Sequence, residues 1–146
     1  MILVDANLLI YAHNPDAPEH ERARAWVERE FSGPTRVGLP WLTLLAFVRI
    51  ASNPVIVRSA VKPAVAWEYV TEWVGRENVW IPAPGARHVE ILGRLLSDST
   101  MTSRLVPDAH LAALAIEHGL TLCSTDGDFA RFAGLKWHNP LAASST

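Results

Sequence analysis

MILVDANLLIY, residues 1–11, decides the fold of this chain, because a short apolar run ends at Asp5 and a second apolar run begins directly after it. Residues 2–4 are too few for a buried helix but suit a strand that is covered on both faces. Asp5 would then lie at the carboxyl end of that strand, the edge at which open α/β sheets bind their ligands. A carboxylate in this position is either a helix cap or a metal ligand.

The composition predicts a folded protein with one domain. The chain has 146 residues, of which 49% are hydrophobic and 19% are charged, and disordered chains show the opposite balance. Because this length is sufficient for one hydrophobic core, we expect a single domain over residues 1–141 and a short polar tail over residues 142–146.

Several classes of protein are excluded by the same totals. The longest apolar stretch, residues 39–48, is too short to span a bilayer, and no basic segment precedes an apolar one as in a signal peptide. The single cysteine, Cys123, has no partner for an internal disulfide or a cysteine-based zinc site. The net charge of −2 gives no support to a generic nucleic-acid-binding surface. We therefore expect a cytoplasmic protein without membrane contact.

Strands and helices are expected to alternate along the chain. Proline at a helix start and glycine at a helix end mark several boundaries, including Pro63, Pro107 and Gly119. The expected strands cover residues 2–4, 36–39, 78–81, 120–123 and 135–137. The expected helices begin at residue 6 and cover residues 18–31, 40–52, 63–74, 86–96 and 107–118. This alternation predicts a mainly parallel sheet in a three-layer α/β/α sandwich.

Acidic residues recur at the ends of these elements. Asp126 follows the strand at residues 120–123, and Asp108 lies in the first turn of the alanine-rich helix before it. A parallel sheet brings Asp5, Asp108 and Asp126 to one edge, with Asp128 close by. Clustered carboxylates repel one another, and a hard divalent cation such as Mg²⁺ or Mn²⁺ relieves that repulsion.

Each acid also has a purely structural interpretation. Asp5 is a plausible helix cap, and Asp108 would complement a helix dipole by about 0.3–1 kcal/mol. Asp126 and Asp128 fit an Asp-Gly turn. Their joint placement at strand ends and at one helix start favours the metal site.

Three motifs in order resemble the PIN-domain ribonucleases and, more narrowly, the VapC toxins of mycobacterial type II toxin–antitoxin pairs. The resemblance extends from residue 2 to about residue 141. Its motifs are LVDAN at residues 3–7, PDAHLAA at 107–113 and STDGDF at 124–129, with support from GLPW at 38–41 and AFVR at 46–49.

This resemblance implies an α/β/α fold and endonucleolytic cleavage of RNA, of the tRNA or rRNA class, with Mg²⁺ or Mn²⁺. It also implies toxicity by blocked translation, a VapB antitoxin that wraps the toxin and covers its acidic site, and a homodimer. By motif, the metal-binding acids are Asp5, Asp108 and Asp126, with Asp128 as an accessory acid at the metal. Asn7 and Thr125 match positions that support these carboxylates through hydrogen bonds.

One departure from the family pattern lies at Ala46. PIN nucleases generally carry a glutamate three residues before a position equivalent to Arg49, and here alanine occupies it. Three interpretations follow: the remaining acids and water suffice, Asp98 or Glu90 replaces the glutamate, or the protein binds RNA and antitoxin with poor catalysis. We favour the first.

Two further sets of residues have a structural and a functional interpretation. Trp67 and Trp73, at helical spacing, are expected to pack in the core, with burial in a dimer or antitoxin groove as the alternative. His110, two residues after Asp108, is expected to be structural. A haloacid-dehalogenase-like phosphohydrolase is a rival, but that family requires an aspartate where this chain has Asn7.

Overall fold

The computed structural model describes residues 1–143, which form one sheet of five parallel strands in the order β3-β2-β1-β4-β5. Residues 144–146 of the expected polar tail lie outside the described residues. The strands are β1 (Ile2–Val4), β2 (Val37–Gly38), β3 (Val79–Trp80), β4 (Thr121–Cys123) and β5 (Trp137–His138). The expected strands are all present, and β2 to β5 are shorter than expected or shifted by about a residue.

The helices likewise follow the expected order. They are α1 (Ala6–His13), α2 (His20–Phe31), α3 (Trp41–Ala51), α4 (Pro63–Val74), α5 (His88–Leu96) and α6 (Val106–His118), with short 3₁₀ turns η1 (Ser103–Leu105) and η2 (Gly127–Arg131). Pro63 opens α4 as expected, whereas α6 begins one residue before Pro107. Gly119 ends α6 in the left-handed conformation with φ 68°, which a residue without a Cβ adopts at little cost.

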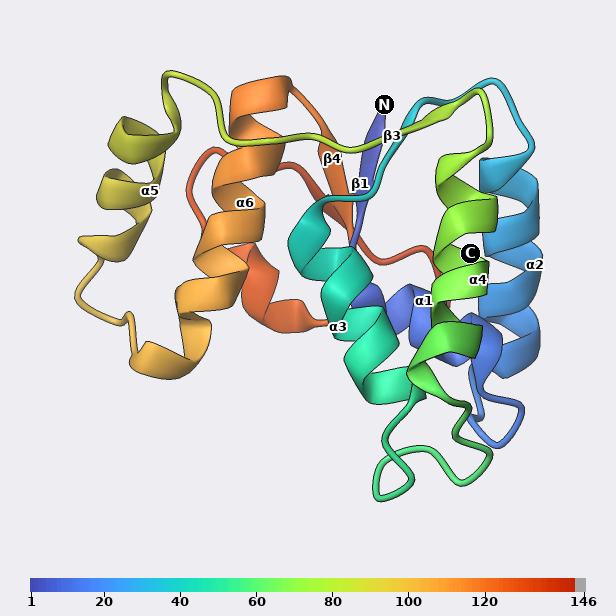
Figure 1. Cartoon of the computed structure of the whole chain (residues 1–146). Coiled ribbons are helices and arrows are strands. Elements are labelled where there is room, and N and C mark those ends of the chain that lie inside the picture. The colour runs from blue at the N-terminus through green and yellow to red at the C-terminus, as the bar shows by residue number, and fades with distance from the viewer. Residues whose placement is uncertain (144–146) are drawn as a thin grey trace.

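Helices cover both faces of the sheet, so the predicted three-layer α/β/α sandwich is confirmed (Figure 1). Helices α1 to α4 pack on one face, and α5 and α6 pack on the other. Successive strand residues point to opposite faces. Leu3 and Leu122 therefore join the α5–α6 core, while Val4 and Cys123 join the other.

The order of the strands reverses between β1 and β4. From β1 the chain proceeds outward to β2 and β3, and it then crosses the opposite face through α5 and α6 to reach β4 beside β1. In open parallel sheets this reversal opens a crevice at the carboxyl ends of the two central strands. Asp5 follows β1 directly, and residues 124–128 follow β4.

The tryptophans on α4 are placed differently from one another. Trp73 is buried and its ring lies edge-on to Phe47 at 4.8 Å, so its predicted core role is confirmed. Trp67 is 42% exposed and stacks on Trp41 at 6.3 Å between ring centroids, so its predicted burial in the core is wrong. The inward face of α4 is instead supplied by Ala66, Val70 and Trp73. Among the described residues, no helix combines the length and apolar character that a bilayer crossing requires.

Candidate functional site

Three carboxylates meet beside the carboxyl ends of β1 and β4. Asp108 comes from the first turn of α6, Asp126 caps η2, and Asp128 lies in the first turn of η2. One carboxylate oxygen from each of these residues lies within 4.8 Å of the others. The sheet topology therefore brings together acids that are up to 20 residues apart in the sequence.

Asp5 lies beside this group, and both of its carboxylate oxygens accept hydrogen bonds. Its Oδ1 accepts a hydrogen bond from the backbone N–H of Ala6 at 2.8 Å, so it caps α1. Its Oδ2 accepts a second hydrogen bond from the hydroxyl of Ser124 at 2.8 Å. Asp5 is not within the 4.8 Å group, but its charge is the largest neighbouring influence on Asp108.

Ser124 joins the two central strand ends, a role that was not predicted from the sequence. Its hydroxyl is fully buried, donates to Asp5, and accepts from Asn7 Nδ2 at 3.1 Å and from the backbone N–H of Asp126 at 3.0 Å. One donor and two acceptor positions are thus all used. The signal in the sequence was a serine two residues before an aspartate, a spacing typical of side-chain-capped turns.

The two predicted supporting residues differ in what they contact. Asn7 reaches Asp5 through the hydroxyl of Ser124 rather than directly. Within residues 1–143, the side chain of Thr125 has no hydrogen bond to any of the acids. The hydroxyl that supports Asp5 is that of Ser124.

Burial and repulsion between the carboxylates raise the pKa of two of the acids. Burial, followed by the charges of Asp5, Asp126 and Asp128, raises the pKa of Asp108 to about 6. Burial also raises the pKa of Asp5, although the hydrogen bonds from Ser124 and Ala6 oppose this effect. A cation at this position would offset the charge repulsion that adds to the effect of burial on both pKa values.

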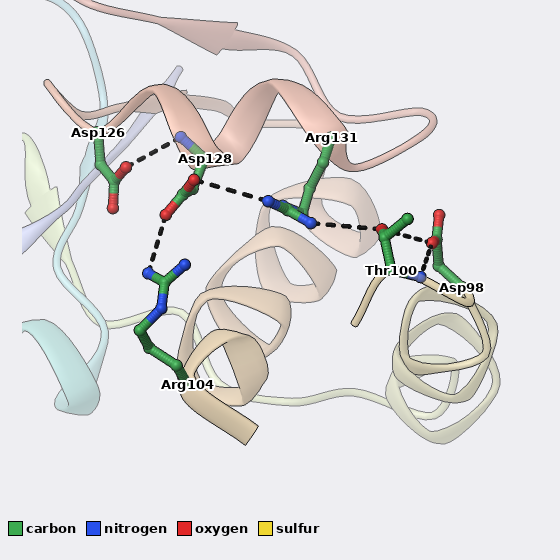
Figure 2. Close-up of polar contacts among 6 residues, drawn as sticks. All are labelled: Asp98, Thr100, Arg104, Asp126, Asp128 and Arg131. Carbon is green, nitrogen blue, oxygen red and sulfur yellow. Dashed lines mark hydrogen bonds and ion pairs between the residues drawn. The ribbon is translucent and has the colours of Figure 1, made fainter. Parts of the chain in front are cut away.

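Asp128 is in the opposite electrostatic situation, because two arginines engage its carboxylate (Figure 2). Arg104 Nη1 donates to Oδ2 at 3.0 Å, and Arg131 Nη2 lies 3.6 Å from Oδ1. The hydrogen bond from Arg104 is the main reason that the pKa of Asp128 is lowered. The backbone N–H of Asp128 donates to Asp126 Oδ1 at 2.9 Å, which connects this ion-paired acid to the rest of the group.

Neither candidate for the missing glutamate belongs to the acidic group. The carboxylate of Asp98 is exposed and accepts hydrogen bonds from the N–H and hydroxyl of Thr100, both at 2.7 Å (Figure 2). Glu90 is exposed on α5. Within residues 1–143 the carboxylates with oxygens within 4.8 Å of one another are those of Asp108, Asp126 and Asp128, and Asp5 lies beside them.

The position of Ala46 is on the helix that faces the end of β1. Thr43, one turn earlier on α3, donates a hydrogen bond to the carbonyl of Val4 at 2.8 Å, directly before Asp5. Ala46 itself is half-buried and offers no donor to an ion. The side of the crevice next to α3 therefore contributes no carboxylate from this position.

The available donors fit a hard divalent cation. They are carboxylate oxygens, and the buried Oδ1 of Asn7 has no hydrogen-bond partner among the described residues, so it is free to accept a hydrogen bond from a water on the ion.

Two other titratable side chains are not candidates for ion binding. Burial raises the pKa of the Cys123 thiol to about 12, so this group remains protonated. His110 lies 3.1 Å from His88 across the α5–α6 contact, consistent with its predicted structural role.

Comparisons with known proteins identify relatives of this chain. Residues 2–135 match the PIN domain. Ribonuclease VapC37 of Mycobacterium tuberculosis is 39% identical over 142 residues, covering 97% of this chain and 99% of that protein. Ribonuclease VapC33 of the same organism is 42% identical over 141 residues, covering 97% and 99%.

A solved structure agrees on the fold. VapBC2 from Rickettsia felis, bound to a DNA fragment from its promoter, has a TM-score of 0.67 at 17% identity, covering 95% of this chain and 98% of that chain. At this identity the likeness concerns the fold alone. The resemblance stated from the three sequence motifs is confirmed by the full-length matches.

Proposed function

Because the chain belongs to the PIN-domain family, and within it to the VapC ribonucleases, we propose that it is the toxin of a type II toxin–antitoxin pair. In this role it cleaves RNA endonucleolytically and thereby inhibits translation. The observation that carries the proposal is that Asp108 and Asp126, which form one carboxylate group with Asp128, lie beside Asp5 at the carboxyl ends of β1 and β4. Relatives of nearly equal length and the name ribonuclease support the same activity.

A divalent metal, Mg²⁺ or Mn²⁺, would be held by Asp5, Asp108 and Asp126, with Asp128 as the accessory acid at the rim of the site. When bound, such an ion lowers the pKa of a coordinated water and stabilises charge on phosphoryl oxygens. The chain itself supplies orientation: Ser124 fixes the carboxylate of Asp5 and the backbone of Asp126 relative to each other. Asp108 must lose its proton before it can serve as a ligand.

The second candidate function is a PIN domain that binds RNA and antitoxin without cleaving RNA. The observation behind it is Ala46, which leaves the α3 side of the crevice without a carboxylate. Against it, the remaining acids keep the burial and mutual repulsion that a cation relieves. We therefore favour the nuclease.

The proposed partners are a VapB-type antitoxin, an RNA of the tRNA or rRNA class, and a second copy of the chain, all within the cytoplasm. The exposed stack of Trp41 on Trp67, beside the exposed Leu45, gives α3 and α4 an apolar surface that suits burial against a second copy. Analytical ultracentrifugation of the wild type and of Trp41→Ala would test the homodimer. A monomeric wild type would contradict it.

The nuclease is tested by incubating purified, antitoxin-free protein with total RNA. Cleavage is expected with Mg²⁺ or Mn²⁺, and it should disappear in EDTA and in the variants Asp5→Asn and Asp108→Asn. Cleavage that survives chelation or both substitutions would contradict the metal-dependent mechanism. If expression arrests growth while the protein cleaves no RNA class, the binding function is the correct one.

A further inference from the structure

Arg104 lies at the rim of the acidic site, where it is paired with Asp128. Its side chain is 70% exposed, and its Nη1 donates a hydrogen bond of 3.0 Å to Asp128 Oδ2. The hydrogen bond to Asp128, and then the charges of Asp128, Asp108 and Asp126, raise the pKa of this guanidinium. An exposed ion pair alone contributes about 0–1 kcal/mol to stability, so fold stability gives little reason for it.

A chain of polar contacts fixes the partner of Arg104 (Figure 2). Arg131 lies 3.6 Å from the other oxygen of Asp128, and its Nη1 donates to the hydroxyl of Thr100 at 3.3 Å. Thr100 is fixed in turn by Asp98. On the other side, the backbone N–H of Asp128 donates to Asp126. The carboxylate that holds Arg104 is therefore anchored both to the acidic site and to the α5–α6 loop.

The guanidinium keeps most of its donors available. Arginine offers five N–H groups in a planar fork, and the contact with Asp128 uses one side of that fork. The remaining N–H groups suit two oxygens of a phosphate. An exposed fork beside the acids that are proposed to hold a metal is thus placed to contact a phosphate bound at the same site.

Charge balance at the site supports the same role. A divalent ion balances two of the four carboxylates at this edge, and Arg104 and Arg131 balance the other two. Without the arginines, the site would remain negative with the metal bound and would repel a polyanion. The chain as a whole carries a net charge of −2, so attraction of RNA must come from local cations such as these.

We propose that Arg104 binds the RNA phosphate at the cleavage position and that Asp128 and Arg131 act as positioning residues that hold it there. The inference rests on the proposed nuclease function and assigns a substrate-binding residue within the same site. Asp128 then serves the site by orienting Arg104 as well as by lying close to the metal-binding acids.

The first test measures RNA binding without catalysis. A fluorescently labelled RNA hairpin is titrated with protein at several salt concentrations with Ca²⁺ in place of Mg²⁺ or Mn²⁺, so that the carboxylates are balanced while cleavage is suppressed, using wild type, Arg104→Gln and the control Arg24→Gln. Arg24 is also exposed and ion-paired, with Glu28 at 3.4 Å, but it lies on α2 and its loss changes the net charge equally. Arg104→Gln should raise the Kd about tenfold. It should also lower the slope of log Kd against log salt concentration by roughly 0.7–1. Arg24→Gln should change the Kd by no more than about twofold and leave this salt slope nearly unchanged.

Two further variants separate a positioned fork from a simple positive charge. Arg104→Lys retains the charge, so it should keep the salt slope while losing about threefold in affinity. Asp128→Asn removes a negative charge near the RNA, which by electrostatics alone would lower KM for cleavage in Mn²⁺. If Asp128 positions Arg104, KM rises instead, by about threefold or more. Circular dichroism melts check that each variant is folded.

The outcomes distinguish this proposal from the nuclease function. If wild type cleaves RNA with Mn²⁺ while Arg104→Gln binds and cleaves as well as Arg24→Gln does, the role of Arg104 is refuted and the function stands. A fall in KM for Asp128→Asn refutes the positioning role. If wild type neither binds nor cleaves any RNA, both the function and the role of Arg104 are refuted.

Discussion

The inner acids, Asp5 and Asp108, and the rim acid, Asp128, lie at the same edge of the sheet but differ in how they are held. Both inner acids are at least partly buried, Asp5 also accepts hydrogen bonds from Ala6 and Ser124, and burial raises the pKa of each. The rim acid is held by two arginines, and the hydrogen bond from Arg104 lowers its pKa.

This difference indicates that the inner acids and the rim acid have different roles in the site. An acid that is buried among other acids gains from a metal ion, because the ion removes the repulsion. An acid already paired with two guanidinium groups gains less, and it fixes those groups where a phosphate would arrive. The inner acids therefore suit metal binding, and the rim acid suits orientation of the substrate.

The largest effect is expected from Asp108→Asn, which removes the charge of one of the two inner acids. Cleavage should fall on the order of 10²–10³-fold, because a metal ligand is lost. The free energy of unfolding of the metal-free protein should rise by about 1 kcal/mol at neutral pH, less than the full pKa shift implies because the carboxyl is half-buried. Single-turnover kinetics and urea denaturation measure the two effects.

The sign of that stability change follows from linkage. The folded-state pKa of Asp108 is raised above 3.8 to about 6, so the native state binds more protons than the unfolded state between these values. Stability of the metal-free protein therefore falls as pH rises from about 4 to about 6, and the asparagine variant lacks this loss. A variant that is both inactive and destabilised would show that Asp108 is structural.

The second largest effect is expected from Ser124→Ala, which removes a hydrogen bond to the inner acid Asp5. The substitution leaves Asp5 Oδ2, Asn7 Nδ2 and the N–H of Asp126 without their shared partner. We expect cleavage to fall roughly 10–100-fold and stability to fall by about 1–3 kcal/mol. Thr125→Ala, which alters the neighbouring hydroxyl, should have a much smaller effect, and equal effects would contradict the assignment to Ser124.

Metal affinity should depend on pH because of the inner acids. Below about pH 6 a proton on Asp108 competes with the ion, so the Kd for Mn²⁺ should increase about tenfold per pH unit. The lowered pKa of Asp128 keeps the rim ion-paired over the same range. Calorimetric titrations at several pH values test this expectation. An affinity that stays constant from about pH 5 to about pH 7 would contradict it.

A smaller effect is expected from Ala46→Glu, which adds an acid on the α3 side. The added carboxylate restores the glutamate that the family pattern has at this position, and Mn²⁺ affinity should increase about three- to tenfold. The matched variant Ala46→Gln offers an uncharged side chain of similar size. Equal affinities for the two variants would show that this position does not reach the ion.

The sequence was sufficient to predict the positions of the inner acids. Asp5 follows a three-residue apolar strand and Asp108 opens an alanine-rich helix, so a parallel sheet brings both to one edge. It was not sufficient for Ser124, because its role depends on the register that places Val4 beside Cys123. A serine at a strand end carries no sign of such a register.

The contact at the rim of the site and the exposed face of α4 also could not be predicted from the sequence. The contact between Arg104 and Asp128 joins residues 24 positions apart through two short 3₁₀ turns, η1 and η2, whose geometry is not encoded in any periodicity. Trp67 fits the helical spacing of α4 but lies on its exposed side, stacked on Trp41. Hydrophobic spacing identifies a helix, whereas the boundary of its buried face depends on the neighbouring elements.

The division between the inner acids and the rim acid is tested most directly by Mn²⁺ titration of three proteins: wild type, Asp108→Asn and Asp128→Asn. Electron paramagnetic resonance reports free Mn²⁺ without any need for RNA or cleavage. The account predicts that Asp108→Asn weakens Mn²⁺ binding at least about 100-fold, while Asp128→Asn stays within about threefold of wild type. Equal loss of Mn²⁺ binding in the two variants, or no binding by the wild type, would contradict it.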